Sequence, residues 1–167
     1  MRVSLCNEGI SFSGSITVLQ WGSFYNYANL SGDVTVLEWG HFWNKGPVGK
    51  ISGGTISGQV DNDGTITGGK FTGTVNNSIT GSITGGDFTG AMVTNEGGSI
   101  TGGTFSGTVT NGEDGEISGG TFNNKTVVNN RGSITDGDFR GATVNNDGTA
   151  TVTGGTFDNF TMNSETG

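Results

Sequence analysis

The sequence predicts an all-β protein, a single-stranded parallel β-solenoid (β-helix) of about nine coils of 17 residues, whose hand the sequence leaves undetermined. Two observations lead to this fold class. A unit of the form I-T-G-G-x-F-x-G-x-V recurs along the 167-residue chain, and 34 glycines are too many for stable helices. One such unit cannot bury its own apolar residues, whereas stacked units can, because each apolar position then forms a ladder.

The first position of each unit is Ile or Val and sets the period. Its members are Ile16, Val34, Ile51, Ile66, Ile83, Ile100, Ile117, Ile134 and Val152. We expect this column to form one wall of the core. Strands of successive coils lie about 4.8 Å apart, so nine coils predict a rod on the order of 43 Å long. The Gly-Gly pair that follows is expected to supply a positive φ or a close backbone approach at a corner.

Two further columns complete the predicted core. The sixth position is aromatic in eight of nine units: Trp21, Trp39, Ile56, Phe71, Phe88, Phe105, Phe122, Phe139 and Phe157. A Val-type position then precedes Asn in six units, through Val60, Val75, Val93, Val109, Val127 and Val144, with Asn62, Asn77, Asn95, Asn111, Asn129 and Asn145 or Asn146. We expect the rings to stack inside the core and the Asn amides to hydrogen-bond along the axis.

Composition divides the chain into three regions of one continuous solenoid domain. Residues 1–15 form a partial N-terminal coil or cap, residues 16–50 two aromatic-rich coils, and residues 51–167 the glycine-rich repeat array. The aromatic-rich coils hold all three Trp, both Tyr and the single His of the chain. Pro47 marks the change into the array.

The unit from Ile100 to Val109, ITGGTFSGTV, resembles the Gly/Thr/Asn-rich β-helix repeats of bacterial surface and adhesin-like proteins. The resemblance covers residues 51–157 and, more loosely, 16–48. It implies a rod-like repeat protein and favours an extracellular or cell-surface location, while the residues themselves leave the location unknown. A weaker resemblance, at the level of architecture, is to the bactofilins, small β-solenoids that polymerise end to end without nucleotide.

No targeting or membrane segment is predicted. The first residues, MRVSLCNEGISF, lack the apolar stretch of a signal peptide, and no apolar run approaches the roughly 20 residues of a membrane helix. We therefore expect no membrane insertion. The net charge of −8 argues against binding to nucleic acid, because its phosphates require basic partners.

Residues for catalysis or metal binding are scarce, and we expect no enzyme, no cofactor and no metal. Cys6 and His41 are the sole thiol and imidazole, and no pattern places them together. The run from Gln59 to Gly64 resembles the start of a calcium loop, but Lys70 stands where that loop requires Glu.

Two surfaces are candidate binding sites. The Ser/Thr column after the Ile position (Thr67, Thr84, Thr101, Ser118, Thr135 and Thr153) resembles the hydroxyl arrays of ice-binding solenoids, although Thr also simply suits outward strand positions. An aromatic patch of Tyr25, Tyr27, His41 and Trp43 would stack on sugar rings, unless these side chains close the N-terminal core instead.

The function predicted from the sequence is a non-enzymatic, self-assembling β-solenoid that serves as a surface or filament-forming scaffold. The expected partner is a second copy of the chain, stacked end to end through the open strand edges of the terminal coils. The alternative is a binding module, which would bind ice through the Ser/Thr column or carbohydrate through the aromatic patch.

Overall fold

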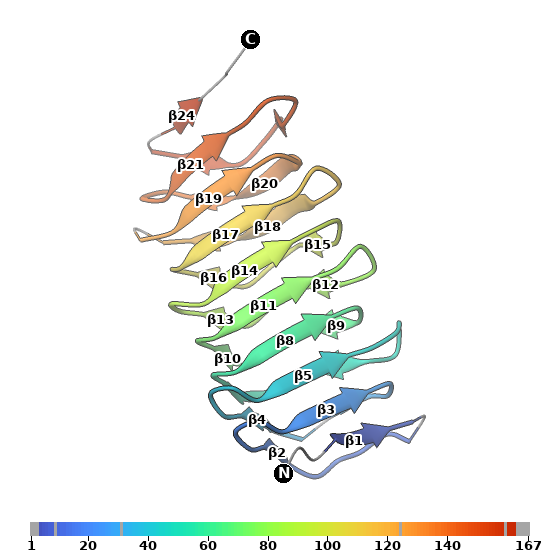
Figure 1. Cartoon of the computed structure of the whole chain (residues 1–167). Helices are drawn as coiled ribbons and strands as arrows, with labels where there is room; N and C mark the ends of the chain where they lie inside the picture. The colour runs from blue at the N-terminus through green and yellow to red at the C-terminus, as the bar shows by residue number, and fades with distance from the viewer. Residues whose placement is uncertain (1–3, 9, 31, 124, 159, 163–167) are drawn as a thin grey trace.

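The computed structural model is a parallel β-solenoid of about nine turns, which confirms the predicted fold class (Figure 1). It describes residues 4–8, 10–30, 32–123, 125–158 and 160–162. Every strand pair is parallel and joins one coil to the next, so the N- and C-terminal coils lie at opposite ends of the rod. The described residues include no helix that could serve as a membrane span.

One side of the rod is a sheet of ten strands, one from each coil. In spatial order, which is also chain order, the strands are β1 (Ser4–Asn7), β3 (Ser23–Asn26), β5 (His41–Asn44), β8 (Gln59–Asn62), β11 (Thr74–Asn77), β14 (Met92–Asn95), β17 (Thr108–Asn111), β19 (Val127–Asn130), β21 (Thr143–Asn146) and β24 (Phe160–Met162). Inside and outside alternate along each strand, so the second and fourth residues of most strands are buried.

The other side is a sheet of fourteen strands in two rows, and twelve of these strands have only two or three residues. The row through the Ile column contains β6 (Lys50–Ile51), β9 (Thr65–Ile66), β12 (Ser82–Ile83), β15 (Ser99–Ile100) and β22 (Thr151–Val152). The row through the Phe column contains β2 (Ile16–Val18), β4 (Val34–Val36), β7 (Gly54–Ile56), β10 (Lys70–Phe71), β13 (Asp87–Phe88), β16 (Thr104–Phe105) and β23 (Thr156–Phe157). The long strands β18 (Glu116–Phe122) and β20 (Ser133–Phe139) join the two rows.

The Ile and Phe columns of the glycine-rich array form the core, as predicted. The six Ile side chains from Ile51 to Ile134 at the first position are fully buried. The rings from Phe71 to Phe157 form one stack, with neighbouring centroids 4.4 to 4.8 Å apart. Each ring therefore contacts the rings of the coils above and below it.

The two aromatic-rich coils have a different register from the predicted one. Val36 pairs with Ile56 and so occupies the Phe column, whereas Val34 pairs with Gly54 and not with Ile51. The prediction that Trp21 and Trp39 belong to the core column is wrong. Both lie in the corner after the strand, because Val18 and Val36 already fill the inward position.

The buried aromatic side chains lie on different sheets in the aromatic-rich coils and in the glycine-rich array. In the aromatic-rich coils, Phe24 and Phe42 are buried on the ten-stranded sheet and face Val18 and Val36. In the array the order is reversed, with Phe on the second sheet and Val on the first. The coil between them carries neither ring, since Ile56 and Val60 occupy the two positions.

The predicted register is also wrong by one residue in the coil of β19. Val128 and Asn130 are buried, and Val127 and Asn129 lie outward. The sequence Val-Val-Asn-Asn fits the Val-x-Asn pattern in two ways, and the structure adopts the second.

The Asn column forms a continuous buried ladder, as predicted, and it extends into the aromatic-rich coils. Each Asn Nδ2 donates to Oδ1 of the Asn in the next coil at 2.6 to 3.0 Å, through Asn7, Asn26, Asn44, Asn62, Asn77, Asn95, Asn111, Asn130 and Asn146. In most coils the same Nδ2 also donates to a loop carbonyl of its own coil, which fixes the direction of the amide. Among the described residues, no buried side-chain nitrogen or oxygen lacks a partner.

In each Gly-Gly pair that follows the Ile column, the second glycine has the predicted positive φ. Gly103 is one example, with φ of +108°. A Cβ atom there would lie 3.2 Å from the ring of Phe88 and 3.3 Å from that of Phe105. Glycine is therefore required both by the backbone conformation and by the stacked rings.

Candidate functional site

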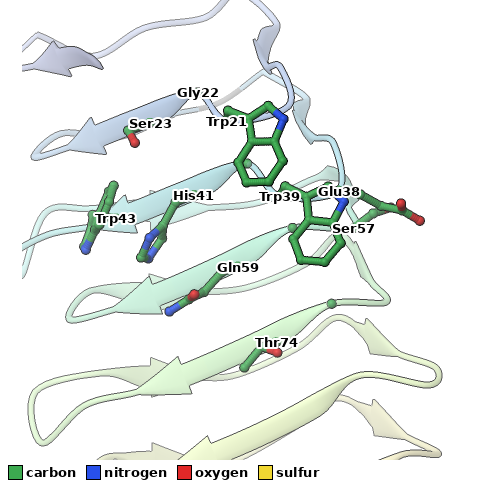
Figure 2. A pocket seen from close by; sticks show the side chains of 13 residues that line it. Trp21, Gly22, Ser23, Glu38, Trp39, His41, Trp43, Ser57, Gln59 and Thr74 are labelled. Carbon is green, nitrogen blue, oxygen red and sulfur yellow. The ribbon is translucent and has the colours of Figure 1, made fainter. Parts of the chain in front are cut away.

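An open groove of about 800 Å³ lies on the corner of the aromatic-rich coils, at the edge of the ten-stranded sheet. Its walls include Trp21, Trp39, His41, Trp43, Gln59 and Thr74. We call it the Trp groove. Figure 2 shows the two indoles on one side of it and His41 with Trp43 on the other.

The groove exists because the corners of successive coils differ in length. Four residues, 37–40, connect the inward Val36 to β5, whereas two residues, 57–58, connect Ile56 to β8. The corner of the next coil, residues 72–73, is equally short. The two long corners, residues 19–22 and 37–40, therefore project as a ridge. The groove continues beyond the end of this ridge, over the short corners at residues 57–58 and 72–73.

A column of glycines leaves the corner beneath the groove without side chains. Gly22, Gly40, Gly58 and Gly73 each directly precede a strand of the ten-stranded sheet. A Cβ atom on Gly58 would lie 2.3 Å from the carbonyl oxygen of Gly40, and one on Gly73 would lie 2.1 Å from that of Gly58. Close backbone packing excludes any larger residue, and the surface stays open as a consequence.

Trp21 and Trp39 project from equivalent positions of the two long corners. Their side chains are 62% and 68% exposed, and their rings stack with centroids 5.7 Å apart and planes inclined by 12°. Both residues have a left-handed backbone, with φ of 63° and 65°, and no other described non-glycine residue does. That conformation costs about 1–2 kcal/mol per residue and is typical of functional positions.

The opposite wall is a second aromatic stack with a polar support. The Trp43 ring lies 4.4 Å from that of Tyr25 and 3.5 Å from that of His41. His41 Nε2 lies 2.6 Å from Asp61 Oδ2, and Gln59 Nε2 donates to the other oxygen of the same carboxylate at 3.3 Å. Asp61 therefore holds two polar side chains of the groove in place.

The structure brings together three of the four residues of the predicted aromatic patch: Tyr25, His41 and Trp43. Of these, His41 and Trp43 line the groove, whereas Tyr25 stacks on Trp43 without lining it. Tyr27 follows β3, is 44% exposed and does not line the groove either. The predicted patch does not include Trp21 and Trp39, the two most exposed aromatic side chains among the described residues. The signal that identifies them is the repeated corner L-x-W-G at residues 19–22 and 37–40, which the later units lack.

The predicted Ser/Thr column lies where the two rows of the second sheet meet. The hydroxyls of Thr67 and Thr84 donate to the carbonyls of Ile51 and Ile66 in the preceding coil, and Thr135 donates to Glu116. The register shifts between β18 and β20, so that Ser118 pairs with Asp136. Thr101 and Thr153 continue the column and are exposed. The interrupted column gives no support to ice binding.

Two carboxylates with a lowered pKa, Asp63 and Asp138, each form an ion pair. Burial acts to raise the pKa of Asp63, but hydrogen bonds from Lys45 and Ser78 and the charge of Lys45 together lower it, with Lys45 Nζ 2.5 Å away. Hydrogen bonds from the Arg140 side chain and backbone lower the pKa of Asp138 to about 2. Within the described ranges, no three His, Cys, Asp or Glu side chains form a group that could hold a metal ion.

No family model, curated protein or solved structure matches the chain. Its likeness to adhesin-like repeats and bactofilins therefore extends to the β-solenoid architecture alone.

Proposed function

We propose that this protein is a non-enzymatic β-solenoid scaffold that binds carbohydrate in the Trp groove. The observation that carries the proposal is the pair of tryptophans, Trp21 and Trp39, each more than 60% exposed and each held in a left-handed backbone conformation. Burial of a large aromatic side chain is favourable because it removes apolar surface from water. Two exposed rings in strained corners therefore favour a ligand that covers them.

Carbohydrate fits the chemistry of the groove. The apolar C–H face of a sugar ring packs on a flat aromatic face, and its hydroxyls require polar partners at the rim. The groove offers both, since His41, Gln59 and Glu38 lie beside the two indoles. Because Asp61 fixes His41 and Gln59 before a ligand arrives, little side-chain entropy is lost on binding.

The test is titration of the protein with soluble plant and microbial oligosaccharides, followed by tryptophan fluorescence and calorimetry. We expect binding by the unmodified protein and its loss in the double variant Trp21→Ala, Trp39→Ala. Tyr27→Ala is the matched control, because Tyr27 is an exposed aromatic of the same coils outside the groove. Equal loss in the control, or binding that survives the double variant, contradicts the proposal.

A second proposal, end-to-end self-association, is supported by the edges of the ten-stranded sheet. In the described part of the chain, β1 and β24 each have one neighbour in this sheet. Outward residues of the inner strands direct their N–H groups to the preceding coil, as His41 does to Gly22 and Gln59 to Gly40. Cys6 has the same outward register in β1, so its N–H points away from β3 and is available to a second copy.

The Cys6 donor permits a specific test of assembly. Proline at position 6 removes the N–H that faces a second copy. It removes no hydrogen bond between β1 and β3. Under reducing conditions, we expect Cys6→Pro to shift sedimentation from filaments or oligomers to monomers, while Cys6→Ala does not. A monomeric unmodified protein at high concentration overturns self-association and leaves the carbohydrate proposal unaffected.

A further inference from the structure

We infer that the ligand of the Trp groove is an extended, uncharged glycan chain that runs parallel to the rod axis, with successive sugar rings on Trp21, on Trp39 and beside Gln59. This inference rests on the proposed carbohydrate binding and adds the class of glycan and its direction.

The direction follows from where the groove residues lie along the axis. The walls are contributed by four successive coils, through Ser23, His41, Gln59 and Thr74 at the starts of their strands. Three strand spacings of about 4.8 Å give a groove length of roughly 14 Å. Across the axis, the groove is bounded by the tryptophan ridge on one side and the His41–Trp43 stack on the other (Figure 2).

The spacing of the tryptophans suits successive rings of one chain. Their centroids are 5.7 Å apart along the axis, and Figure 2 shows both rings with a broad face turned to the same side. A sugar in an extended β-linked chain advances by about one such spacing. Rings stacked on Trp21 and Trp39 would therefore place a third ring over the bare corner at Gly58, within reach of the Gln59 amide and the Thr74 hydroxyl.

The charge of the groove selects an uncharged chain. Glu38 is the one acidic residue among those that line it, and Asp61 contacts the lining side chains of His41 and Gln59. The lining contains no Lys or Arg, and the whole chain carries a net charge of −8. Uronates and sulfated glycans would be repelled, whereas neutral or N-acetylated sugars would not.

The experiment is calorimetric titration of the full chain with β-1,4-linked oligomers of glucose and of N-acetylglucosamine, from the monosaccharide to the hexasaccharide. We expect the affinity to rise roughly two- to tenfold with each ring up to the third or fourth, and then to level off. An oligomer of galacturonic acid of matched length is expected not to bind.

A variant pair tests the position of the third ring. Gln59→Ala should reduce affinity for the trisaccharide roughly two- to tenfold and reduce affinity for the disaccharide less. Thr108→Ala is the control, because Thr108 has the same outward register on β17, far from the groove. Fluorescence of the tryptophans, with melting curves, confirms that both variants are folded.

The outcomes separate this inference from the proposal beneath it. Equal affinity for one ring and for four, or tighter binding of the uronate, overturns the extended uncharged chain and leaves carbohydrate binding standing. An equal effect of Gln59→Ala on disaccharide and trisaccharide overturns the placement of the third ring. Absence of binding to every oligosaccharide overturns carbohydrate binding itself.

Discussion

The aromatic-rich coils and the glycine-rich array solve the same packing problem with opposite arrangements. In the five array coils that contain Phe71, Phe88, Phe105, Phe122 and Phe139, the ring lies on the second sheet and a Val faces it, as with Phe105 and Val109. In the aromatic-rich coils the ring lies on the ten-stranded sheet, as with Phe42 and Val36. In both arrangements one large and one small side chain face each other across the core. The core volume is therefore conserved, and only the sheet that carries the ring differs.

The difference extends from the core to the surface. The array coils turn from the Phe column to the next strand through corners of two to four residues, which leave few large apolar side chains exposed. The aromatic-rich coils turn through the four-residue corners that carry Trp21 and Trp39. Eight of the ten large hydrophobic residues that are exposed in the described chain lie between Ile10 and Val48. The regular repeats therefore lie in the array, whereas most of the exposed large apolar side chains lie on the N-terminal side of it.

The largest expected effect is the loss of a ring from the array. Phe105→Ala removes a buried ring that stacks on both neighbours at 4.8 Å, so we expect a loss of about 3–5 kcal/mol in the free energy of unfolding. Val36→Ala, at the equivalent position of the aromatic-rich coils, removes fewer atoms and should cost less. Denaturant unfolding measures both, and equal costs would contradict the reversed arrangement.

A second prediction concerns the feature that the two regions share. Asn111→Ala leaves the Asn130 Oδ1 without its buried donor and the Asn95 Nδ2 without its acceptor in the next coil. At roughly 1–3 kcal/mol for each unpaired group, we expect a loss of about 2–4 kcal/mol. Urea unfolding measures it, with the outward Thr110→Ala as control. A loss no greater than that of the control would show that the ladder does not stabilise the fold.

A third prediction concerns a double variant, Val36→Phe with Phe42→Val, that moves the boundary between the two regions by one coil. Phe42→Val leaves a cavity and Val36→Phe overfills the opposite wall, so each single change should destabilise, the overfilled wall by about 1–3 kcal/mol. In the double variant the array arrangement extends into β4 and β5, and the volume is restored. We expect a favourable coupling of about 1–3 kcal/mol in a double-mutant cycle. Additive costs would mean that the two walls pack independently.

A smaller effect is expected at the corner that distinguishes the aromatic-rich coils. Trp39→Gly removes a side chain that is 68% exposed and relieves a φ of 65°. We expect stability within about 1 kcal/mol of the unmodified protein, with oligosaccharide binding lost. Thermal unfolding and calorimetry on the same sample measure both. A large drop in melting temperature would assign the ring a structural role instead.

The smallest effect concerns an exposed charge pair of the array. Arg140→Gln should raise the pKa of Asp138 from about 2 towards its ordinary value of 3.8, because the variant removes the hydrogen bonds of the guanidinium. A lowered carboxyl pKa stabilises the fold above pH 3.8, and the stabilisation disappears as the pH falls through about 2. NMR titration of the carboxyl carbon measures the shift, and an unchanged pKa would mean that the backbone N–H alone determines it.

Much of the array could be predicted from sequence because each column repeats one residue type. Ile100, Gly103 and Phe105 have the positions that the repeat indicates. The aromatic-rich coils could not be placed in the same way. Ile16 and Trp21 stand five residues apart, as Ile51 and Ile56 do, but the extended corner displaces the register.

The groove was predictable only in part, for the same physical reason. Tyr25, His41 and Trp43 alternate outward along strands, so their grouping follows from strand pairing. The exposure of the tryptophans depends on corners that are two residues longer than those of the next coils, and on a left-handed backbone that sequence periodicity does not encode.

The Asn ladder also gives the rod an electrical polarity. Each amide carries a dipole of roughly 3.5 D, and every one in the row points its N–H towards the C-terminal end of the rod. Such dipoles add and polarise one another, unlike the backbone dipoles of β-strands, which largely cancel. One end of the rod is therefore slightly positive and the other slightly negative. Two rods that approach head to tail would meet with attraction, and two that approach head to head with repulsion.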